Sequence, residues 1–445
     1  MRRADHDRAA AAALAAAFLA GDWDPAAMGR RGKRALADRR RWVVEVAEIV
    51  VRAYPDRPAD RPRELATFVA ACEPFARQVP TDRPPRAQVW MAAPTEMGTR
   101  RWPVPVIDDL AALARWLGVT PDHLAWFADR RSMERTATDE RLRHHRRRWA
   151  RKADGSPRLL EAPKRELKDL QRQVLHHILD RVPAHDAAHG FRPGRSALTA
   201  ARLHVGRPVV LRFDLESFFT AVGAGRVYGL FRLAGYPEPV AHTLAALCTT
   251  VTPRAVLREA PPAPGGVPGA VERRRRLLHH LAAPHLAQGA PTSPALANLA
   301  AFGLDRRLAG LAERLGARYT RYADDLVLSG DIDRRAAERV GRLVAEIAAG
   351  EGFRVHAGKS RRAAAAQRQA VLGLVVNARP NVPRPDYDRL RAVLHDAARH
   401  GPAAADREGH ADFRAHLLGR ISWVAAANPG RGARLRSAFD AVDWS

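Results

Sequence analysis

The chain has 445 residues and carries 74 basic against 48 acidic side chains, which gives a net charge of +26. With 46% hydrophobic and 27% charged residues, the composition is typical of a globular protein and excludes a disordered polypeptide. The only cysteines, Cys72 and Cys248, exclude a disulfide scaffold and a cysteine-rich zinc module, and they predict a cytoplasmic location. The longest apolar stretch, Ala9 to Ala20, is too short to span a bilayer, so no membrane partner is expected. The excess positive charge predicts a polyanionic partner such as nucleic acid.

The first part of the chain is predicted to be helical. Apolar residues recur at helical spacing from Arg41 to Tyr54 and again from Glu64 to Phe75. The stretch from Pro80 to Pro105 is rich in proline and has little periodicity, so we interpret it as a linker or an irregular segment that wraps around the protein. Two short helices are expected next, one from Ile107 to Leu117 and one that begins at Thr120-Pro121-Asp122, a typical helix N-terminus.

The pattern changes near residue 140. A basic run from Arg141 to Lys152 leads to a turn at Asp154-Gly155-Ser156-Pro157, which is followed by a predicted strand from Arg158 to Glu161 and a helix from about Arg165 to Leu179. From there to about residue 377 strands and helices are predicted to alternate, and the remainder is predicted to be helical. The Pro/Gly-rich stretch from Pro253 to Pro284 is interpreted as an exposed irregular insertion.

Two acidic segments are the strongest functional signals. Between Ala317 and Gly330, β-prone residues flank the adjacent Asp324 and Asp325, which predicts a tight hairpin with both acids at its bend. A second buried-strand pattern ends at Asp214 and continues into an aromatic pair. Each Asp alone is better explained as an ordinary turn or cap residue. Together, one carboxylate from a strand end and two from a hairpin can hold two divalent ions about 3.5–4 Å apart, as in phosphoryl-transfer enzymes.

At Tyr322-Ala323-Asp324-Asp325 the sequence resembles the YxDD signature of reverse transcriptases, and further motifs of that family occur in the right order over about residues 140 to 440. The resemblance implies an α+β right-hand polymerase with fingers, a palm made of an antiparallel sheet plus helices, and a short helical thumb. On this basis residues 1–100 are a helical extension with a linker, 101–207 the fingers with a helical lead-in, 208–383 the palm with an irregular insertion at 253–286, and 384–445 the thumb.

The resemblance also implies the catalytic centre. The first palm motif is matched around Asp214, so the expected catalytic metal ligands are Asp214, Asp324, Asp325 and the backbone of Leu215. Two Mg²⁺ ions are the expected cofactor, with Mn²⁺ able to replace them. Phe219 lies where the family has its steric gate, a ring that excludes a 2′-hydroxyl and thereby selects deoxynucleotides.

Other matches concern the nucleotide and the primer. Gln288 and Gly289 resemble the motif that packs on the nascent base pair. Lys359 is implied as the general acid for the leaving pyrophosphate. The segment around Gly373 resembles the primer grip, in which backbone and apolar contacts hold the primer end.

Basic residues are expected to contact the substrates. Lys152 and Arg158 flank the turn at which the family binds the triphosphate of a dNTP. Arg192 and Arg195 lie on a Gly/Pro turn that suits template or nucleotide phosphates, and a purely structural turn is the alternative. Tyr322 and His204 are likewise expected among the template or primer contacts.

Within the family, the sequence resembles bacterial retron reverse transcriptases, which make a branched RNA–DNA hybrid from their own non-coding RNA. Residues 378–445 fit a helical thumb but not an RNase H, maturase or endonuclease domain. The segment from Ala200 to His204 keeps the alanine and histidine of the retron NAxxH element but lacks its asparagine, and Leu372 replaces the threonine of the VTG element.

The implied function is that of an RNA-directed DNA polymerase, a nucleotidyltransferase, active in antiphage defence. The expected partners are a structured non-coding RNA, its cDNA product, dNTPs and an effector or toxin protein. A different bacterial defence or domesticated reverse transcriptase, with another template or priming mode, is the first alternative. A decayed polymerase retained as an RNA-binding module is the second, and it is disfavoured by the joint presence of Asp214, Asp324, Asp325, Phe219, Gln288 and Lys359.

Overall fold

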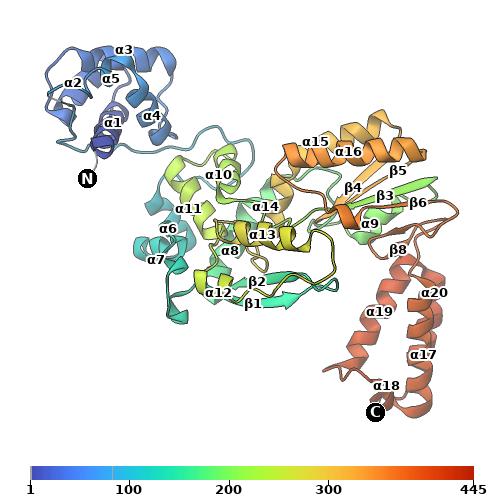
Figure 1. The fold of residues 1–445 in the computed structure, drawn as a ribbon. Helices are drawn as coiled ribbons and strands as arrows, with labels where there is room; N and C mark the ends of the chain where they lie inside the picture. Colours follow the sequence, from blue (N-terminus) through green and yellow to red (C-terminus); the bar gives the residue numbers. More distant parts are fainter. Residues whose placement is uncertain (1–2, 83, 445) are drawn as a thin grey trace. The chain divides into compact units, whose positions relative to one another are not determined.

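The computed structural model describes residues 3–82 and 84–444, which form two compact units (Figure 1). The first unit comprises Met1–Pro183 and Val222–Leu296, and the second comprises Ala184–Ala221 and Ala297–Ser445. Each unit contains its own hydrophobic core residues.

Five helices occupy the N-terminal part of the first unit: α1 (Arg3–Leu19), α2 (Pro25–Leu36), α3 (Trp42–Ala53), α4 (Pro62–Ala71) and α5 (Glu73–Ala76). The side chain of Asp24 caps α2 by accepting a hydrogen bond from the backbone N–H of Ala27. The apolar faces of the helices meet in one core, which includes Phe18, Met28, Trp42 and Phe75. The helix predicted at 41–54 is confirmed, and the one predicted at 64–75 is divided at Cys72 between α4 and α5.

The predicted irregularity is confirmed, because residues 84–109 form no regular helix or strand. The helix after it, α6 (Leu110–Leu117), starts later than predicted because the side chain of Asp109 caps it. Gly118 ends α6 with a φ of 71°, a left-handed conformation that glycine adopts without strain. Thr120 caps α7 (Pro121–Ala128) as expected.

Two strands form a hairpin in the first unit. β1 (His145–Arg151) pairs antiparallel with β2 (Pro157–Pro163) across the predicted turn at Asp154-Gly155, and α8 (Arg165–His177) follows. The strand predicted after the turn is confirmed, but the basic run before it is a strand that the pattern does not predict. It escapes detection because one of its inward-facing residues is Arg147, whose guanidinium pairs with Glu134 and Glu161. A charged residue at a buried position hides the alternation that identifies a strand.

The region predicted as an irregular insertion at 253–286 is helical over half of its length, which corrects the prediction. It contains α12 (Arg254–Arg258) and α13 (Ala270–Leu281), preceded by α10 (Ala224–Leu233) and α11 (Glu238–Cys248). Val256 and Leu281 pack with Leu159 of β2 in a small core. Within the region, residues 253, 259–269 and 282–286 belong to no helix or extended strand. The many prolines and glycines of the connection at 259–269 conceal the helices on either side.

The second unit contains a four-stranded antiparallel sheet with the strand order β4-β5-β3-β6. Its strands are β3 (Val209–Asp214), β4 (Arg318–Tyr322), β5 (Asp325–Gly330) and β6 (Arg361–Ala364). Figure 1 shows α15 (Phe302–Arg314) and α16 (Arg334–Gly350) together over one face of the sheet and α9 (Ala197–Arg202) near the other.

The predicted alternation of strands and helices is wrong between β3 and β4. There the described chain forms only helices, α10 to α15, and these include α14 (Ser293–Ala300). Short apolar runs do not distinguish a buried helix from a buried strand, which explains the error. The predicted strand ending at Asp214 and the predicted hairpin around Asp324 are both confirmed.

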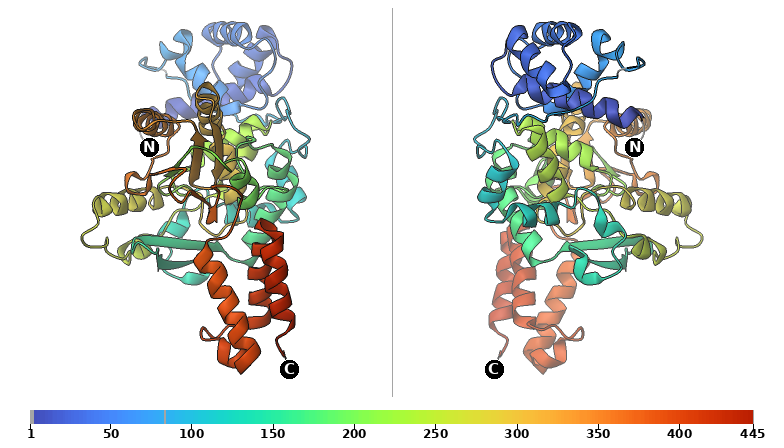
Figure 2. Two further views of the ribbon diagram at one scale, coloured as in Figure 1. Left: turned by 90° about the vertical axis from the view of Figure 1, so that its right-hand side faces the viewer. Right: turned by 90° about the vertical axis from the view of Figure 1, so that its left-hand side faces the viewer.

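The C-terminal helices of the second unit confirm the predicted helical end. After the small hairpin of β7 (Ala370–Val371) and β8 (Leu374–Val375) come α17 (Arg384–His400), α18 (Pro402–Ala405), α19 (Phe413–Ala427) and α20 (Pro429–Asp440). Figure 2 shows the longer helices side by side, and their shared core includes Tyr387, Leu390, Leu417, Leu435 and Phe439. Four 3₁₀ turns complete the described elements: η1 (Met133–Arg135), η2 (Glu140–Leu142), η3 (Leu179–Arg181) and η4 (Ala357–Lys359).

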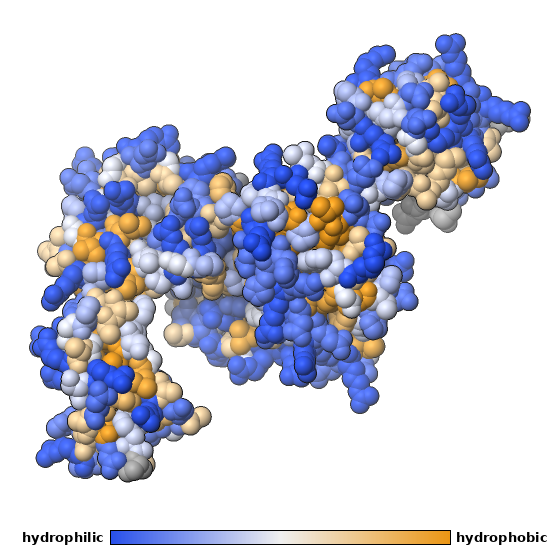
Figure 3. Space-filling view, turned by 180° about the vertical axis from the view of Figure 1, so that it is seen from behind, coloured by the Kyte–Doolittle hydropathy of each residue, from blue (hydrophilic) through white to orange (hydrophobic). Residues whose placement is uncertain are grey.

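Hydrophilic side chains predominate on the face drawn in Figure 3, over both units, with hydrophobic ones in smaller groups. No described helix is long and apolar enough to cross a membrane.

Candidate active site

A tight turn places two adjacent acids at the end of the sheet in the second unit. β4 ends at Tyr322 and β5 begins at Asp325, so Ala323 and Asp324 form the turn. Ala323 has a φ of 53°, in the left-handed region that residues with a side chain seldom adopt. Gly190 lies against this turn, and a Cβ on it would be 2.9 Å from the backbone N of Ala323. The site therefore holds a strained turn by close packing, as functional sites often do.

A fully buried arginine supports the turn. The Arg321 guanidinium donates to both carboxylate oxygens of Asp305, at 2.8 and 2.6 Å, to Oδ1 of Asn298 at 2.9 Å and to the carbonyl of Ala323 at 3.2 Å. The hydroxyl of Tyr319 donates to Asp305 as well, at 2.9 Å. A buried charge that is compensated in this way fixes the geometry around it.

Sequence reasoning missed this network. A signal for it in the sequence is an arginine, Arg321, within a β-prone segment that also carries two tyrosines.

Asp214 and Asp325 face each other across neighbouring strands. They are register partners in the antiparallel β3–β5 pair, and the backbone N–H of Leu215 donates to the carbonyl of Asp324 at 2.9 Å. Directly opposed residues on adjacent strands have their side chains on the same face of the sheet. Burial and the charge of Asp214 raise the pKa of the Asp325 carboxyl above its ordinary value, against the opposing effect of Arg212. The pair thus concentrates negative charge that a cation would stabilise.

Two basic side chains approach the carboxylates. Lys359 Nζ lies 3.4 Å from each carboxylate oxygen of Asp214, and Arg212 Nη2 lies 3.4 Å from Oδ1 of Asp325. The backbone N–H of His356 donates to the carbonyl of Asp214 at 2.7 Å, which holds the segment carrying Lys359 beside β3. The contacts of the two cations are longer than the 2.7–2.9 Å of a strong charge-assisted hydrogen bond. The cations therefore neutralise the acids only loosely.

The chemistry of this donor set fits a hard divalent cation, because carboxylate oxygens are the ligands that Mg²⁺ and Mn²⁺ prefer. In residues 3–82 and 84–444, however, no three His, Cys, Asp or Glu side chains are grouped closely enough to hold a metal ion. The structure brings Asp214 and Asp325 together but does not gather Asp324 with them into the predicted set of three carboxylates.

An aromatic rim lies beside the acids. The ring centroid of Phe219, the predicted steric gate, lies 6.1 Å from that of Phe191, which in turn lies 6.1 Å from that of Tyr322. Phe191 is 47% exposed and has a φ of 59°. Exposed rings of this kind suit stacking with bases or sugars. The sequence patterns do not single out Phe191, although it lies on the Gly/Pro turn that also carries Arg192.

The predicted triphosphate contacts lie in the first unit. Lys152 follows β1, and its backbone N–H donates to the carbonyl of Ser156 at 2.9 Å to close the turn of the β1–β2 hairpin. Arg158, near the start of β2, is exposed. Both residues therefore lie near the tip of the hairpin.

Gln288 and Gly289 also lie in the first unit, against β2. The carbonyl of Gln288 accepts a hydrogen bond from the backbone N–H of Glu161 at 2.9 Å. Gly289 has a φ of 134°, and a Cβ on it would be 3.1 Å from the carbonyl oxygen of Glu161. Glycine is required there because the two backbones approach so closely.

The predicted template and primer residues differ in their surroundings. Arg192 donates to the backbone carbonyls of His185 and Ala188, at 2.8 and 3.1 Å, so much of its hydrogen-bonding capacity is used within the protein. Arg195 is exposed, and its guanidinium contacts His189 at 3.5 Å. Gly373 has a φ of 82° in the turn between β7 and β8.

The assignment of His204 as a direct template or primer contact is wrong, because its side chain is fully buried. Its Nδ1 lies 2.7 Å from the hydroxyl of Ser329, and its Nε2 lies 2.8 Å from the hydroxyl of Thr320. Burial lowers the pKa of His204 to about 3, so its ring is neutral at physiological pH. His204 therefore links the end of α9 to β4 and β5.

Comparison with known proteins agrees with this geometry. Residues 150–376 match the family described as reverse transcriptase (RNA-dependent DNA polymerase). The chain is 43% identical over 343 residues to the retron Mx65 reverse transcriptase of Myxococcus xanthus, covering 77% of this chain and 74% of the relative. It is 40% identical to the retron Mx162 reverse transcriptase of the same organism, and this match covers 73% of this chain and 65% of the relative.

Two further similarities are more distant. The retron Ec86 reverse transcriptase of Escherichia coli is 32% identical over 239 residues, covering 54% of this chain and 64% of that one. A solved foamy viral protease-reverse transcriptase in complex with double-stranded DNA is 14% identical, with a TM-score of 0.32, covering 68% of this chain and 44% of that one.

The matched residues span half of the chain. They include β3 with Arg212, the acidic hairpin of β4 and β5, and the segment that carries Lys359. The chain belongs to the reverse transcriptases, and its curated relatives place it among those of retron type. It is accordingly an RNA-directed DNA polymerase.

Proposed function

We propose that this reverse transcriptase copies a structured non-coding RNA of its own locus into DNA and yields an RNA–DNA hybrid, in antiphage defence. The observation that carries the catalytic part is the register pair of Asp214 and Asp325 beside Lys359. Membership in the retron type supports the choice of template.

In this proposal the four-stranded sheet with α15 and α16 is the palm, the β1–β2 hairpin with α8 belongs to the fingers, and α17–α20 form the thumb. The helices before residue 100 are an extension of the polymerase. The two buried, free cysteines fit a reducing compartment such as the cytoplasm.

The proposed metal ligands are Asp214, Asp324, Asp325 and the backbone of Leu215. Two Mg²⁺ ions, or Mn²⁺ in their place, would supply activation of the primer hydroxyl and stabilisation of the leaving pyrophosphate. Lys359 lies within reach of Asp214, where its ammonium group can hold a proton for the pyrophosphate.

The remaining residues select and position the substrates. Phe219 excludes a ribose 2′-hydroxyl, and Lys152 with Arg158 binds the dNTP triphosphate. Gln288 and Gly289 pack on the nascent base pair through the backbone that contacts β2.

For the template and the primer, we assign Arg195 and Tyr322 to nucleic acid contacts and the Gly373 turn to the primer end. Arg192 positions the loop that carries them, because it holds two backbone carbonyls. An effector or toxin protein is the proposed partner in defence, on the strength of the retron relatives alone.

The test is the nucleic acid that co-purifies with the protein expressed from its native locus. Wild-type protein should carry one small DNA joined to a structured RNA encoded beside the gene. Asp325→Asn should carry the RNA without DNA, whereas Asp331→Asn, at an exposed acid after β5, should match the wild type. DNA of varied sequence in the wild type would contradict the retron template, and DNA persisting in Asp325→Asn would contradict the site.

A further inference from the structure

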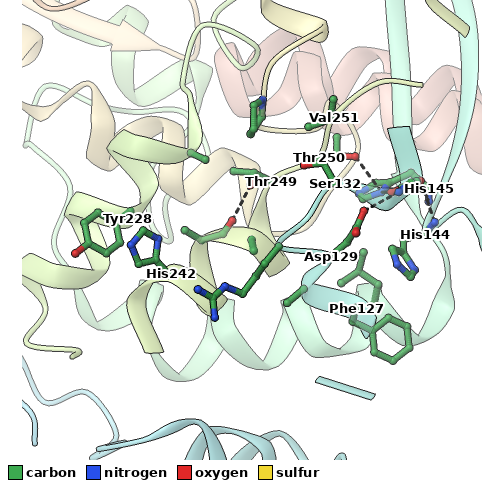
Figure 4. A pocket seen from close by; sticks show the side chains of 18 of the residues that line it. Phe127, Asp129, Ser132, His144, His145, Tyr228, His242, Thr249, Thr250 and Val251 are labelled. Carbon is green, nitrogen blue, oxygen red and sulfur yellow. Dashed lines mark hydrogen bonds and ion pairs between the residues drawn. The ribbon is translucent and has the colours of Figure 1, made fainter. Parts of the chain in front are cut away.

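A pocket in the first unit lies apart from the turn that carries the proposed triphosphate contacts (Figure 4). It has a volume of about 400 Å³, and its walls come from the end of α7 and the loop after it, the start of β1, and parts of α4, α8, α10 and α11. Lys152 lies at the other end of β1, and a strand of that length spans roughly 20 Å. The volume lies near the lower end of the range for small-molecule sites and suits a single nucleotide.

Two arginines bring positive charge to this pocket. Within the part of the chain that the structure describes, neither Arg63 nor Arg130 has an ion pair or a hydrogen bond through its guanidinium group. Both arginines line the same pocket, and burial and the charge of Arg63 lower the pKa of Arg130. An anion placed between them would offset both positive charges.

The acidic residues in the pocket wall are already engaged and do not neutralise the arginines. The carboxylate of Asp129 accepts hydrogen bonds from the backbone N–H groups of Met133 and Glu134, at 2.7 and 2.9 Å. The carboxylate of Glu134 pairs with Arg147 at 2.7 Å.

An aromatic stack forms another part of the wall. The rings of Tyr228 and His242 lie nearly parallel, with centroids 4.1 Å apart and an interplanar angle of 22° (Figure 4). Burial and the charges of Arg63 and Arg130 lower the pKa of His242, so its ring is neutral near pH 7. A flat, neutral stack of this kind is suited to contact a nucleobase.

A buried polar atom at the pocket also lacks a partner. His145 is 3% exposed, and its Nδ1 lies 3.3 Å from the hydroxyl of Thr250. Its Nε2 is buried and makes no hydrogen bond to any described residue. Buried polar atoms nearly always have a partner, so this pocket-lining histidine keeps one unused hydrogen-bonding position.

We propose that this pocket binds a phosphorylated nucleoside, with its phosphate between Arg63 and Arg130 and its base against the Tyr228–His242 stack. The site does not depend on the proposed polymerase mechanism, and its nucleotide is a bound ligand rather than a substrate for DNA synthesis. A free nucleotide and a nucleotide of bound RNA share this chemistry.

The test is isothermal titration calorimetry on the nuclease-treated full-length protein in EDTA, with AMP and with the 5′-phosphorylated tetraribonucleotide pAAAA as probes. EDTA removes metal-dependent dNTP binding from the measurement. Arg130→Ala should weaken binding roughly 10- to 100-fold, as expected for the loss of a hydrogen bond to a charged group. The matched control is Arg131→Ala, which removes the same charge at an exposed neighbour outside the pocket and should change affinity less than about twofold.

If AMP binds, and Arg130→Ala but not Arg131→Ala weakens its binding, a free nucleotide is identified as the ligand. If only pAAAA binds, with the same effects of the two variants, RNA is identified as the ligand. Absence of binding by both probes, or equal effects of Arg130→Ala and Arg131→Ala, would overturn the proposal. Thermal unfolding should show that the variants are folded. If Arg130→Ala does not fold, His242→Ala is the second variant, and it should weaken binding by removing part of the aromatic stack. Primer extension in Mg²⁺ on the same preparations tests the polymerase separately, and Arg130→Ala should retain it.

Discussion

Charged groups meet under the β1–β2 hairpin of the first unit and at the acidic turn of the second unit, but they are paired differently at these two sites. In the first unit, Glu161 lies 2.9 Å from Arg147 and 2.7 Å from His285 at the base of the β1–β2 hairpin. In the second, Asp214 and Asp325 have their cationic neighbours at 3.4 Å. The first arrangement is closed and fully buried, whereas the second leaves its carboxylates with loose partners.

The pKa directions of the acids follow the same division. Despite burial, which acts to raise it, the pKa of Glu161 is lowered to about 2 by His285 and Arg147, and that of Glu134 is lowered to about 2 by His145 and Arg147. The pKa of Asp325 is raised by burial and by Asp214. The protein therefore stabilises the charged form of the acids under the hairpin but not that of Asp325. This difference separates acids that support the fold from acids that are suited to hold an external cation.

The largest expected effect tests the loosely paired site. Asp214→Asn should reduce primer extension by on the order of 10²–10³-fold or more, because it removes a charge that acts on the reacting groups. Its effect on thermal unfolding should be small, since the contact to Lys359 is long and partly exposed. Asp331→Asn is the control for charge alone. Normal DNA synthesis by Asp214→Asn would remove this acid from the catalytic centre.

The next prediction concerns the buried network under the acidic turn. Asp305→Ala should lower the free energy of unfolding by about 3–5 kcal/mol, because it leaves Arg321 as an uncompensated buried charge. Urea unfolding measures this directly. Glu351→Ala removes the partly exposed pair with Arg307 and should cost no more than about 1 kcal/mol. Equal costs for the two variants would show that the Arg321 network does not stabilise the fold.

A third prediction compares an acid under the β1–β2 hairpin, Glu134, with an acid of the candidate active site, Asp325. The pKa of Glu134 is lowered from its ordinary value of 4.5 to about 2. Its carboxylate therefore contributes about 3 kcal/mol to the free energy of unfolding above pH 4.5, and this contribution is lost as the pH falls through about 2. Asp325 has a raised pKa, so its charged form costs stability at neutral pH. Glu134→Gln should therefore destabilise the protein at pH 7, and Asp325→Asn should leave it as stable or make it more stable.

Urea unfolding at pH 7 and pH 3 checks both signs. The stability of Glu134→Gln should also depend less on pH than that of the wild type across this interval. If both variants destabilise the protein equally at pH 7, the contrast between the two regions does not hold.

The acidic centre could be predicted from sequence because each of its parts is local. A strand that ends at Asp214 and a hairpin around Asp324 follow from short patterns, and the register that opposes Asp214 to Asp325 is the step that needs the structure. Phe191 was missed because its importance comes from two rings distant in sequence, those of Phe219 and Tyr322.

Two of the errors in the fold prediction have identifiable causes. One is a charged residue at a buried position, and the other is a Pro/Gly-rich connection. The strand β1 was missed because Arg147 occupies an inward position, which is tolerated only because Glu134 and Glu161 neutralise it. The helices α12 and α13 were missed because the connection between them dominates the local composition. Single-sequence patterns describe what a residue prefers, and they do not show which distant partner offsets an unfavourable choice.

The smallest expected effect concerns His204, which a family motif assigned to nucleic acid and the structure places in the core. His204→Ala should cost about 1–3 kcal/mol, because the hydroxyls of Ser329 and Thr320 lose their partner. Its template affinity, measured at matched stability, should equal that of the wild type, since a buried ring with a pKa near 3 offers no charge to a phosphate. Arg195→Ala should show the reverse, with weaker template binding at unchanged stability. If a stable His204→Ala protein bound the template more weakly than the wild type, the strands that His204 connects, β4 and β5, would contribute to the contact with nucleic acid.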